Sequence, residues 1–372
     1  MKKVLTTTLL SGLLAAPVMA GDFIANTFYD AQHPLAKYGY TEWAEIVKDL
    51  SGGDLNPQVF TGTVLLAPRA ALQGIRDNVV QVGHHAAIYT PSDLPVANAV
   101  QELGFNYSDP LVAIFAVADF SMHNATQLAE WQDQGVVYLG AYATPPYILM
   151  CADPVRNLAE LKGKRIRTAG SAVSAWVEEA GGVPVNVPSS EMYTGLERGT
   201  LDCATNAAND LVDRSLLEVA EHTTLLPTGM YWSGPNWGYN PEFWSGLSAD
   251  ERKVLMEASA RSMARTIINY SAQAEASLTT AQEKGGHVYE PEADLMASVE
   301  EFRAQTLANV YDKAEADYGL TNAHEVIDAF TATMAKWDGL LAAVDRNDED
   351  ALTALALSEI YGDIDPATYG VK

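Results

Sequence analysis

Short apolar runs alternate along the first two-thirds of the chain with segments whose apolar positions have helical spacing. Residues 55–60 and 79–82 form such runs and predict strands, whereas residues 35–50 and 68–78 predict helices. The Ser51-Gly52-Gly53 segment is a stop signal for the first of these helices. This alternation predicts an α/β fold with a largely parallel sheet.

The same alternation restarts after Gly135 and predicts a second α/β unit. Strands are expected over residues 136–139, 147–151, 164–168, 183–187 and 201–205, and helices over 157–162, 174–180 and 190–198. Residues 140–146 lie between the two units and predict a crossover from one to the other.

One long helix is predicted after Pro241. Ser248 followed three residues later by Glu251 is a capping-box pattern, and no proline or glycine interrupts the chain from there to Lys284. A helix of about 35 residues would be about 50 Å long. This length exceeds the width of one domain, so we expect the helix to run along both units. The remainder, to about residue 361, predicts further amphipathic helices.

The first twenty residues have the layout of a secretory signal peptide. Lys2 and Lys3 form a basic start, residues 9–16 are apolar, and Val18-Met19-Ala20 suits a cleavage site after Ala20. The alternative is a membrane anchor, but the apolar run is too short to cross about 30 Å of hydrocarbon. We therefore expect an exported protein in an oxidising, periplasmic compartment.

Composition and charge narrow the function classes. The 372 residues favour about two domains at roughly 150 residues each. With 23 basic and 48 acidic residues the formal charge is -25, which disfavours contact with nucleic acid or anionic lipid. No other apolar run reaches the length of a membrane span either, so no direct membrane insertion is expected. The two cysteines, Cys151 and Cys203, either pair or remain buried thiols, and the sequence leaves both open.

Motifs for metal, nucleotide or nucleophilic chemistry are missing from the sequence. The seven histidines include no pair at helical i, i+4 spacing, and no CxxC, GxxxxGK[ST], GxGxxG or GxSxG motif is present. His84 and His85 are adjacent, and neighbouring strand residues point to opposite faces. We therefore expect no metal, no cofactor and no catalytic residue, although one of these histidines could donate a hydrogen bond to an anion at the sheet edge.

Arg167 is the leading candidate for ligand binding. On a strand over residues 164–168, Arg165 and Arg167 share one face, and Arg167 comes last, before a Gly/Ser loop and a helix. The carboxyl end of such a strand is where α/β sheets present ligands. A guanidinium matches a carboxylate or sulfonate, and the helix start near Ser171 would add free N–H groups. The alternative, a surface basic cluster that balances acids, is equally compatible with the spacing.

Six aromatic residues crowd into residues 231–244, and they suit either a pocket lining or a core. They are Tyr231, Trp232, Trp237, Tyr239, Phe243 and Trp244. We expect Phe243 and Trp244 in the core, whereas the assignment of Tyr231, Trp232 and Trp237 stays open.

Several segments, in order, resemble the solute-binding proteins of tripartite ATP-independent periplasmic (TRAP) transporters, the DctP family. The match runs from about Asp22 to Val344. The segments are Gln32-His33-Pro34-Leu35-Ala36, Leu50-Ser51-Gly52-Gly53-Asp54-Leu55, Leu161-Lys162-Gly163-Lys164-Arg165-Ile166-Arg167, Ser190-Glu191-Met192-Tyr193 with Gly199-Thr200-Leu201-Asp202, and Asn240-Pro241-Glu242-Phe243-Trp244 with Leu247-Ser248-Ala249-Asp250-Glu251.

This resemblance implies a two-lobed periplasmic binding protein (a Venus-flytrap) with hinge strands and a long helix spanning both lobes. It implies that a small organic anion, a carboxylate or sulfonate, binds between the lobes and is delivered to a TRAP membrane permease. Arg167 matches the arginine that pairs with the ligand, Asn206 a contacting position, and residues 84–89 the contribution of the first lobe. The candidate ligand-binding set is Arg167, Asn206, His84, His85, Tyr89, Trp232 and Asn209.

The sequence also departs from the family. The second basic residue of some members is missing at Thr144-Pro145-Pro146-Tyr147, and Thr205-Asn206 replaces the Glu-Trp pair of metal-holding members, so no metal is predicted. The expected division is 1–20 signal peptide, 21–143 plus 233–268 lobe I, 144–232 plus 269–345 lobe II, and 346–372 C-terminal extension. The alternatives are an ABC-type periplasmic binding protein and a periplasmic enzyme acting on an organic acid.

Overall fold

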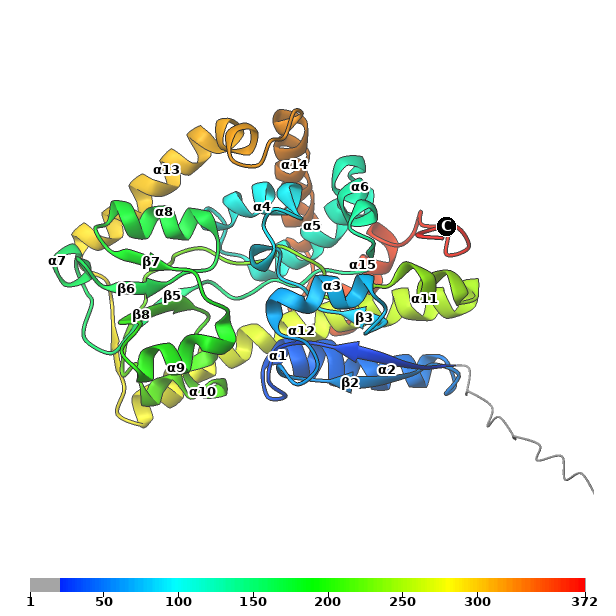
Figure 1. Cartoon of the computed structure of the whole chain (residues 1–372), viewed down its shortest axis with the longest axis horizontal. Helices are drawn as coiled ribbons and strands as arrows, with labels where there is room; N and C mark the ends of the chain where they lie inside the picture. The colour runs from blue at the N-terminus through cyan, green and yellow to red at the C-terminus, as the bar shows by residue number, and fades with distance from the viewer. Residues whose placement is uncertain (1–20, 372) are drawn as a thin grey trace, which may run out of the picture.

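The structure, a computed structural model, describes residues 21–371 and contains two sheets surrounded by helices (Figure 1). The predicted signal peptide lies outside the described residues. The sheet of lobe I has the order β2 (Asn56–Phe60), β1 (Asp22–Asn26), β3 (Val82–Gly83), β10 (Gly238–Tyr239), β4 (Val137–Tyr138). The sheet of lobe II has the order β11 (His287–Tyr289), β9 (His222–Thr224), β5 (Ile148–Cys151), β8 (Cys203–Asn206), β6 (Arg165–Arg167), β7 (Val183–Val185).

Both sheets are largely parallel, as the sequence predicts, but each contains one strand that runs in the opposite direction. β10 runs antiparallel to β3 and β4, and β5 runs antiparallel to β8 and β9. β5 and β10 are the strands through which the chain enters each sheet after crossing from the other. Because the chain crosses in opposite directions, it inserts a strand of opposite sense into each sheet.

The two crossings lie side by side and hydrogen-bond to each other. The N–H of Thr144 donates to the carbonyl of Tyr231 at 3.0 Å, and the N–H of Tyr147 donates to the carbonyl of Gly229 at 2.7 Å. The predicted crossover at residues 140–146 is therefore confirmed, and the return segment near residues 229–237 pairs with it. Together these segments form the hinge strands expected for a two-lobed protein.

The long helix is present as α12 (Ala249–Glu283), with Ser248 and Glu251 forming the reciprocal capping box. Its first half, including Leu255 and Ile267, belongs to the core of lobe I, whereas Ala281 packs in a core cluster of lobe II. Figure 1 shows α12 running from one lobe to the other. The helix therefore spans both lobes, as its length predicts.

Helices that follow the long helix return to lobe I. α14 (Ala323–Leu341) packs on the almost wholly buried α5 (Pro110–His123), with the ring of Trp337 stacked 5.1 Å from that of Phe115. The expected assignment of residues 269–345 to lobe II is therefore wrong for α14, because its apolar face covers the apolar surface of α5. α15 (Glu349–Glu359) packs on α12, so the predicted C-terminal extension is part of the core of lobe I.

The remaining helices cover the two sheets. They are α1 (Pro34–Ala36), α2 (Glu42–Leu50), α3 (Ala71–Arg76), α4 (Pro95–Gln101), α6 (Ala125–Asp133), α7 (Leu158–Leu161), α8 (Ser171–Glu179), α9 (Met192–Glu197), α10 (Asp210–Asp213), α11 (Pro241–Gly246) and α13 (Ala293–Ala316). The helix predicted over residues 35–50 is interrupted by a π-helical turn (Lys37–Thr41), where the indole of Trp237 donates to the carbonyl of Gly39 at 2.9 Å. None of the helices in residues 21–371 has an apolar stretch long enough to cross a bilayer.

Cys151 and Cys203 form a disulfide, which settles the alternative left open by the sequence. The two residues are direct partners across the antiparallel pair β5 and β8, with their Cα atoms 4.0 Å apart. The bond fits the oxidising compartment expected for an exported protein. It joins the strand that leaves the hinge to the strand that ends at Asn206.

Candidate ligand-binding site

An apolar cluster rich in tyrosine lies where the two lobes meet, and we call it the interlobe cluster. Lobe I, the hinge strands, lobe II and α12 all contribute to it. Its members are Phe28, Tyr29, Leu35, Ala36, Ala86, Ile88, Tyr89, Tyr142, Tyr147, Ala169, Ala207, Tyr231 and Tyr270. The polar candidates are described below by their position relative to this cluster.

Arg167 ends β6 beside the interlobe cluster, and its side chain is only 2% exposed. Its Nε donates to the carbonyl of Val187 at 3.1 Å and its Nη1 to the carbonyl of Thr205 at 3.2 Å. Nη2 makes no hydrogen bond to any described residue, and no carboxylate within residues 21–371 forms an ion pair with this guanidinium. Burial therefore excludes the surface-cluster alternative for Arg167.

Arg165 shows the opposite arrangement two residues earlier. Its side chain is 42% exposed and donates hydrogen bonds to the carboxylate of Asp202 from Nε at 2.9 Å and from Nη2 at 2.7 Å. Both oxygens of Asp202 are engaged, so the positive charge of Arg165 is neutralised at the surface. The two arginines therefore have different roles although they share one short strand.

Asn206 and Asn209 surround the fully buried carboxylate of Asp210. The side-chain amide of Asn206 donates to Asp210, and that of Asn209 donates to Asp210 at 3.0 Å and to Asp213 at 3.1 Å. Burial raises the pKa of Asp210, while the neighbouring Arg214 opposes this rise. The side-chain oxygen of Asn209 is buried without a partner, so it remains an acceptor that a ligand could use.

Arg214 is a second buried arginine that the sequence analysis did not single out. Its Nε lies 3.2 Å from Oδ2 of Asp210, and its Nη1 lies 3.5 Å from Asp30 of lobe I. The guanidinium also lies over the ring of Tyr29, 5.4 Å from the ring centre. The spacing of Asp210 and Arg214, four residues apart, was a usable signal, because such pairs meet on one helix face.

His84 faces the interlobe cluster and His33 lies next to it. The ring of His84 packs 4.5 Å from that of Tyr142, its Nδ1 pairs with Asn236 at 3.0 Å, and its Nε2 is buried without a partner. The ring of His33 stacks 4.1 Å from that of Tyr29. Burial lowers the pKa of His84 to about 3 and that of His33 well below its usual value, so both rings are neutral near pH 7.

Tyr89 and two further candidates occupy different places. The hydroxyl of Tyr89 accepts a hydrogen bond from the N–H of Ser189 at 3.1 Å, which bridges the lobes. His85 instead pairs with the hydroxyl of Thr90 at 2.9 Å. Trp232 packs in the core of lobe I against Phe330, with ring centres 5.6 Å apart, and not in the interlobe cluster. The structure therefore gathers Arg167, Asn206, Asn209, His84 and Tyr89, but separates His85 and Trp232 from them.

Two other expectations change with the structure. The hydroxyl of Ser171, at the start of α8, donates to Glu102 of lobe I, so a protein carboxylate already lies at this helix terminus. Of the aromatic residues left open by the sequence, Tyr231 joins the interlobe cluster and Trp237 joins the core of lobe I. Within the described part of the chain, no three His, Cys, Asp or Glu side chains gather as metal ligands.

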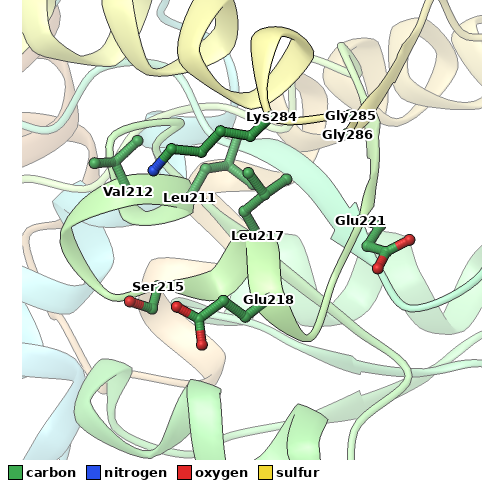
Figure 2. A pocket seen from close by; sticks show the side chains of 9 residues that line it. All are labelled: Leu211, Val212, Ser215, Leu217, Glu218, Glu221, Lys284, Gly285 and Gly286. Carbon is green, nitrogen blue, oxygen red and sulfur yellow. The ribbon is translucent and has the colours of Figure 1, made fainter.

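A surface hollow of about 370 Å³ lies elsewhere, between the segment after α10 and the end of α12. Figure 2 shows Lys284 extending across it toward Val212, with Ser215 and Glu218 opposite. None of the candidate ligand-binding residues lines this hollow, so it is separate from the interlobe site.

Two α/β lobes joined by paired hinge strands and a shared helix, with a buried arginine between them, define the class of two-lobed solute-binding proteins. The family described as bacterial extracellular solute-binding protein, family 7 (DctP) matches residues 25–315. The chain therefore belongs to this family, whose members are extracytoplasmic proteins.

Similar proteins of known type agree with this membership. A solute-binding protein of Albidiferax ferrireducens is 22% identical over 223 residues, which span 59% of this chain and 64% of that protein. The C4-dicarboxylate-binding periplasmic protein DctP of Rhodobacter capsulatus is 24% identical over 270 residues, which span 68% and 76%. The structure of a TRAP solute binding protein from Rhodoferax ferrireducens T118, in complex with copurified benzoate, superposes with a TM-score of 0.76 at 19% identity, covering 86% and 99% of the two chains.

Proposed function

We propose that this protein is the solute-binding component of a TRAP transporter. It captures a small organic anion, a carboxylate or sulfonate, between its lobes and delivers it unchanged to the membrane permease. One observation carries the proposal within this family: the guanidinium of Arg167 is buried at the lobe boundary and forms no ion pair with a carboxylate of the described residues. A buried charge without a counter-ion is costly, and a ligand anion supplies the missing charge.

The proposed site consists of the groups that remain free around Arg167. Nη2 of Arg167 donates to the ligand anion, and charge-assisted hydrogen bonds of this kind contribute roughly 1.5–3 kcal/mol each. His84 and Asn209 add a buried ring nitrogen and a buried amide oxygen without partners. Asn206 and Tyr89 complete the set from the two lobes. Binding favours the closed form, because only that form surrounds the anion from both sides.

The acidic surface does not prevent anion capture. Removing the predicted signal peptide deletes two lysines, so the mature chain has 21 basic and 48 acidic residues, a formal charge of -27. Salt screens this charge beyond about 8–10 Å. The ligand therefore responds mainly to the local field of Arg167.

Two steps of the proposal concern the compartment and the partner. We place the mature protein in the periplasm after cleavage behind Ala20, and the mass of the N-terminal peptide of the exported protein tests this site. The permease partner is tested by genome neighbourhood and co-purification, which should yield two TRAP membrane subunits and no ATPase.

A matched pair of variants tests the role of Arg167. A thermal-shift screen of small carboxylates and sulfonates first identifies a ligand, because a ligand that binds only the native state raises the melting temperature. Arg167→Ala should then weaken its affinity at least 100-fold by calorimetry, since charge and hydrogen bonds are lost together. Arg165→Ala removes the same charge two residues away and should leave affinity within threefold. Undiminished affinity in Arg167→Ala would refute the proposal.

Turnover is the remaining alternative function. If the protein were an enzyme acting on an organic acid, the ligand would change mass during incubation. We expect mass spectrometry to recover the ligand unaltered after prolonged contact with the protein.

A further inference from the structure

The interlobe site holds one buried cation, Arg167, that forms no ion pair within residues 21–371, although its charge acts on the nearby carboxylate of Asp210. Arg214 lies 3.2 Å from Asp210 and 3.5 Å from Asp30, so protein carboxylates already balance its charge. Among the described residues, the side chain of Arg167 has only backbone carbonyls as hydrogen-bond partners. A ligand therefore meets one guanidinium that has no ion-pair partner of its own, although two buried arginines are present.

The other titratable groups around the site do not add a second positive charge. Burial lowers the pKa of His33 and of His84, so both rings are neutral near pH 7. Burial raises the pKa of Asp213 to about 6, so this neighbour of Asn209 is largely a carboxylate at pH 7 and adds negative charge. Burial also raises the pKa of tyrosines such as Tyr147, which therefore stay neutral.

The interlobe cluster around the site consists mainly of aromatic residues, and several of their hydroxyls already bind within the protein. The hydroxyl of Tyr89 accepts from Ser189, that of Tyr231 accepts from the N–H of Ile88 at 2.9 Å, and that of Tyr142 donates to the carbonyl of Ser233 at 3.0 Å. These residues offer a ligand ring surface and neutral hydroxyl groups, but no positive charge. Aromatic rings pack well against a flat ring, but their faces carry partial negative charge.

We propose that this site selects a monocarboxylate that carries a flat ring, such as benzoate or phenylacetate, and rejects dicarboxylates. One carboxylate pairs with Arg167, and the ring packs among the tyrosines of the interlobe cluster. A second carboxylate would be buried against ring faces without a cation, which is costly. This inference rests on the proposed function and specifies its ligand class.

The binding of four acids to the unmodified protein tests whether the ligand is a monocarboxylate with a flat ring. Benzoate and phenylacetate carry one carboxylate on a ring, terephthalate adds a second carboxylate to the ring, and succinate has two carboxylates without a ring. We expect benzoate or phenylacetate to bind at least tenfold more tightly than terephthalate and succinate by calorimetry at pH 7.5. Equal or tighter binding of either dicarboxylate overturns the inference.

The outcomes separate this inference from the proposed function. Tight succinate binding that is lost in Arg167→Ala would overturn the ring-monocarboxylate class and leave the anion-capture function standing. Failure of all four acids to bind also overturns the class, whereas the function itself is decided by the broader screen of carboxylates and sulfonates.

A charge variant tests the balance between Arg214 and Asp210. Asp210→Asn keeps the size of the side chain but removes the charge that neutralises Arg214, so it should raise affinity for terephthalate relative to benzoate at least fivefold. Asp213→Asn removes a nearby carboxylate that makes no ion pair with Arg214 and serves as the matched control. An equal change in both variants, or none in Asp210→Asn, contradicts the charge argument. If Asp210→Asn does not fold, the panel of four acids decides alone.

Discussion

At the scale of single residues, burial and pairing decide which arginine can bind an anion. Arg165 and Arg167 are two residues apart on β6, yet Arg165 is neutralised by Asp202 at the surface and Arg167 is buried against backbone carbonyls. Arg214 is buried too, but it is paired with Asp210. The same side chain thus serves as a surface ion pair, a proposed ligand contact or a buried structural partner, according to its neighbours.

The buried pair of Arg214 and Asp210 predicts a strong effect on stability. Removing one member leaves an uncompensated buried charge, which costs about 3–5 kcal/mol. Arg214→Met should therefore lower the free energy of unfolding by about this amount in urea titrations. The double variant Arg214→Met/Asp210→Asn removes both charges and should recover part of the loss. A double variant that is less stable than the single variant would contradict this explanation.

The sequence alone predicted only some of the residues of this site. Arg167 was found because a basic residue at the end of a strand is rare in an acidic chain. Arg214 was missed because its partner Asp210 is one of 48 acidic residues, so the pairing did not stand out. Tyr29 and His33 were not selected either, since they come from the first strand–helix connection. They reach the site only through the packing of the two lobes, which no local pattern encodes.

At the scale of helices and strands, elements with local signals were predicted and elements defined by partners were not. The boundaries of α12 follow from its capping box and from the lack of proline and glycine within it. The two-residue strand β10 has no comparable signal, because it is a strand only by pairing with β3 and β4. The place of α14 likewise depends on α5, a partner about 200 residues away in the sequence.

The disulfide between Cys151 and Cys203 predicts a second effect on stability. It closes a sequence separation of 52 residues, and a loop of this size corresponds to about 4 kcal/mol in the chain-entropy model. Cys151→Ala/Cys203→Ala should therefore lower the midpoint of thermal unfolding by several degrees. As a check that the disulfide has formed, a thiol reagent should find no free thiol in wild-type protein that is unfolded without a reducing agent. Reduction of the wild type should reproduce the loss, and an unchanged midpoint would mean that the bond adds no stability.

His123 predicts a dependence of stability on pH at the end of α5. A hydrogen bond to Asp119, followed by one to Asp363, raises the pKa of His123 to about 9, although burial opposes the rise. Because the pKa is higher in the folded state than the unfolded value of about 6.5, the stabilisation is complete below pH 6.5 and is lost as the pH rises through 9. Urea unfolding of the wild type should therefore show this loss between pH 6.5 and 9.5.

Substitution isolates this contribution from other titrating groups. In His123→Asn, the loss of unfolding free energy that the imidazole of His123 causes between pH 6.5 and 9.5 should be absent. The free energies of unfolding of the variant and the wild type should therefore converge above pH 9. His324→Asn is the control, since His324 stacks on Tyr311 and forms no ion pair in the described part of the chain. Parallel pH curves for the wild type and His123→Asn would contradict the assignment.

At the scale of the whole molecule, the two lobes are held together by polar contacts on several sides of the interlobe cluster. Tyr89 bridges to Ser189, and Asp30 pairs with Arg214. On another side, Glu102 of lobe I accepts from Ser171 of α8 and pairs with Lys313 at 2.8 Å. The two lobes are therefore in direct polar contact, and these contacts should stabilise the closed form in which a ligand is proposed to bind.

The contact between Ser171 and Glu102 predicts how closure contributes to affinity. Ser171→Ala removes one bridging hydrogen bond but leaves Glu102 paired with Lys313, so no buried charge is orphaned. A hydrogen bond to a carboxylate contributes roughly 1.5–3 kcal/mol, or about 10- to 150-fold in affinity. The loss should appear as faster ligand dissociation in stopped-flow measurements, because the closed form is weakened. Ser174→Ala, whose hydroxyl bonds within lobe II to Gly170 at 2.9 Å, should leave dissociation unchanged. Equal rates for Ser171→Ala and the wild type would show that this bridge does not hold the closed form.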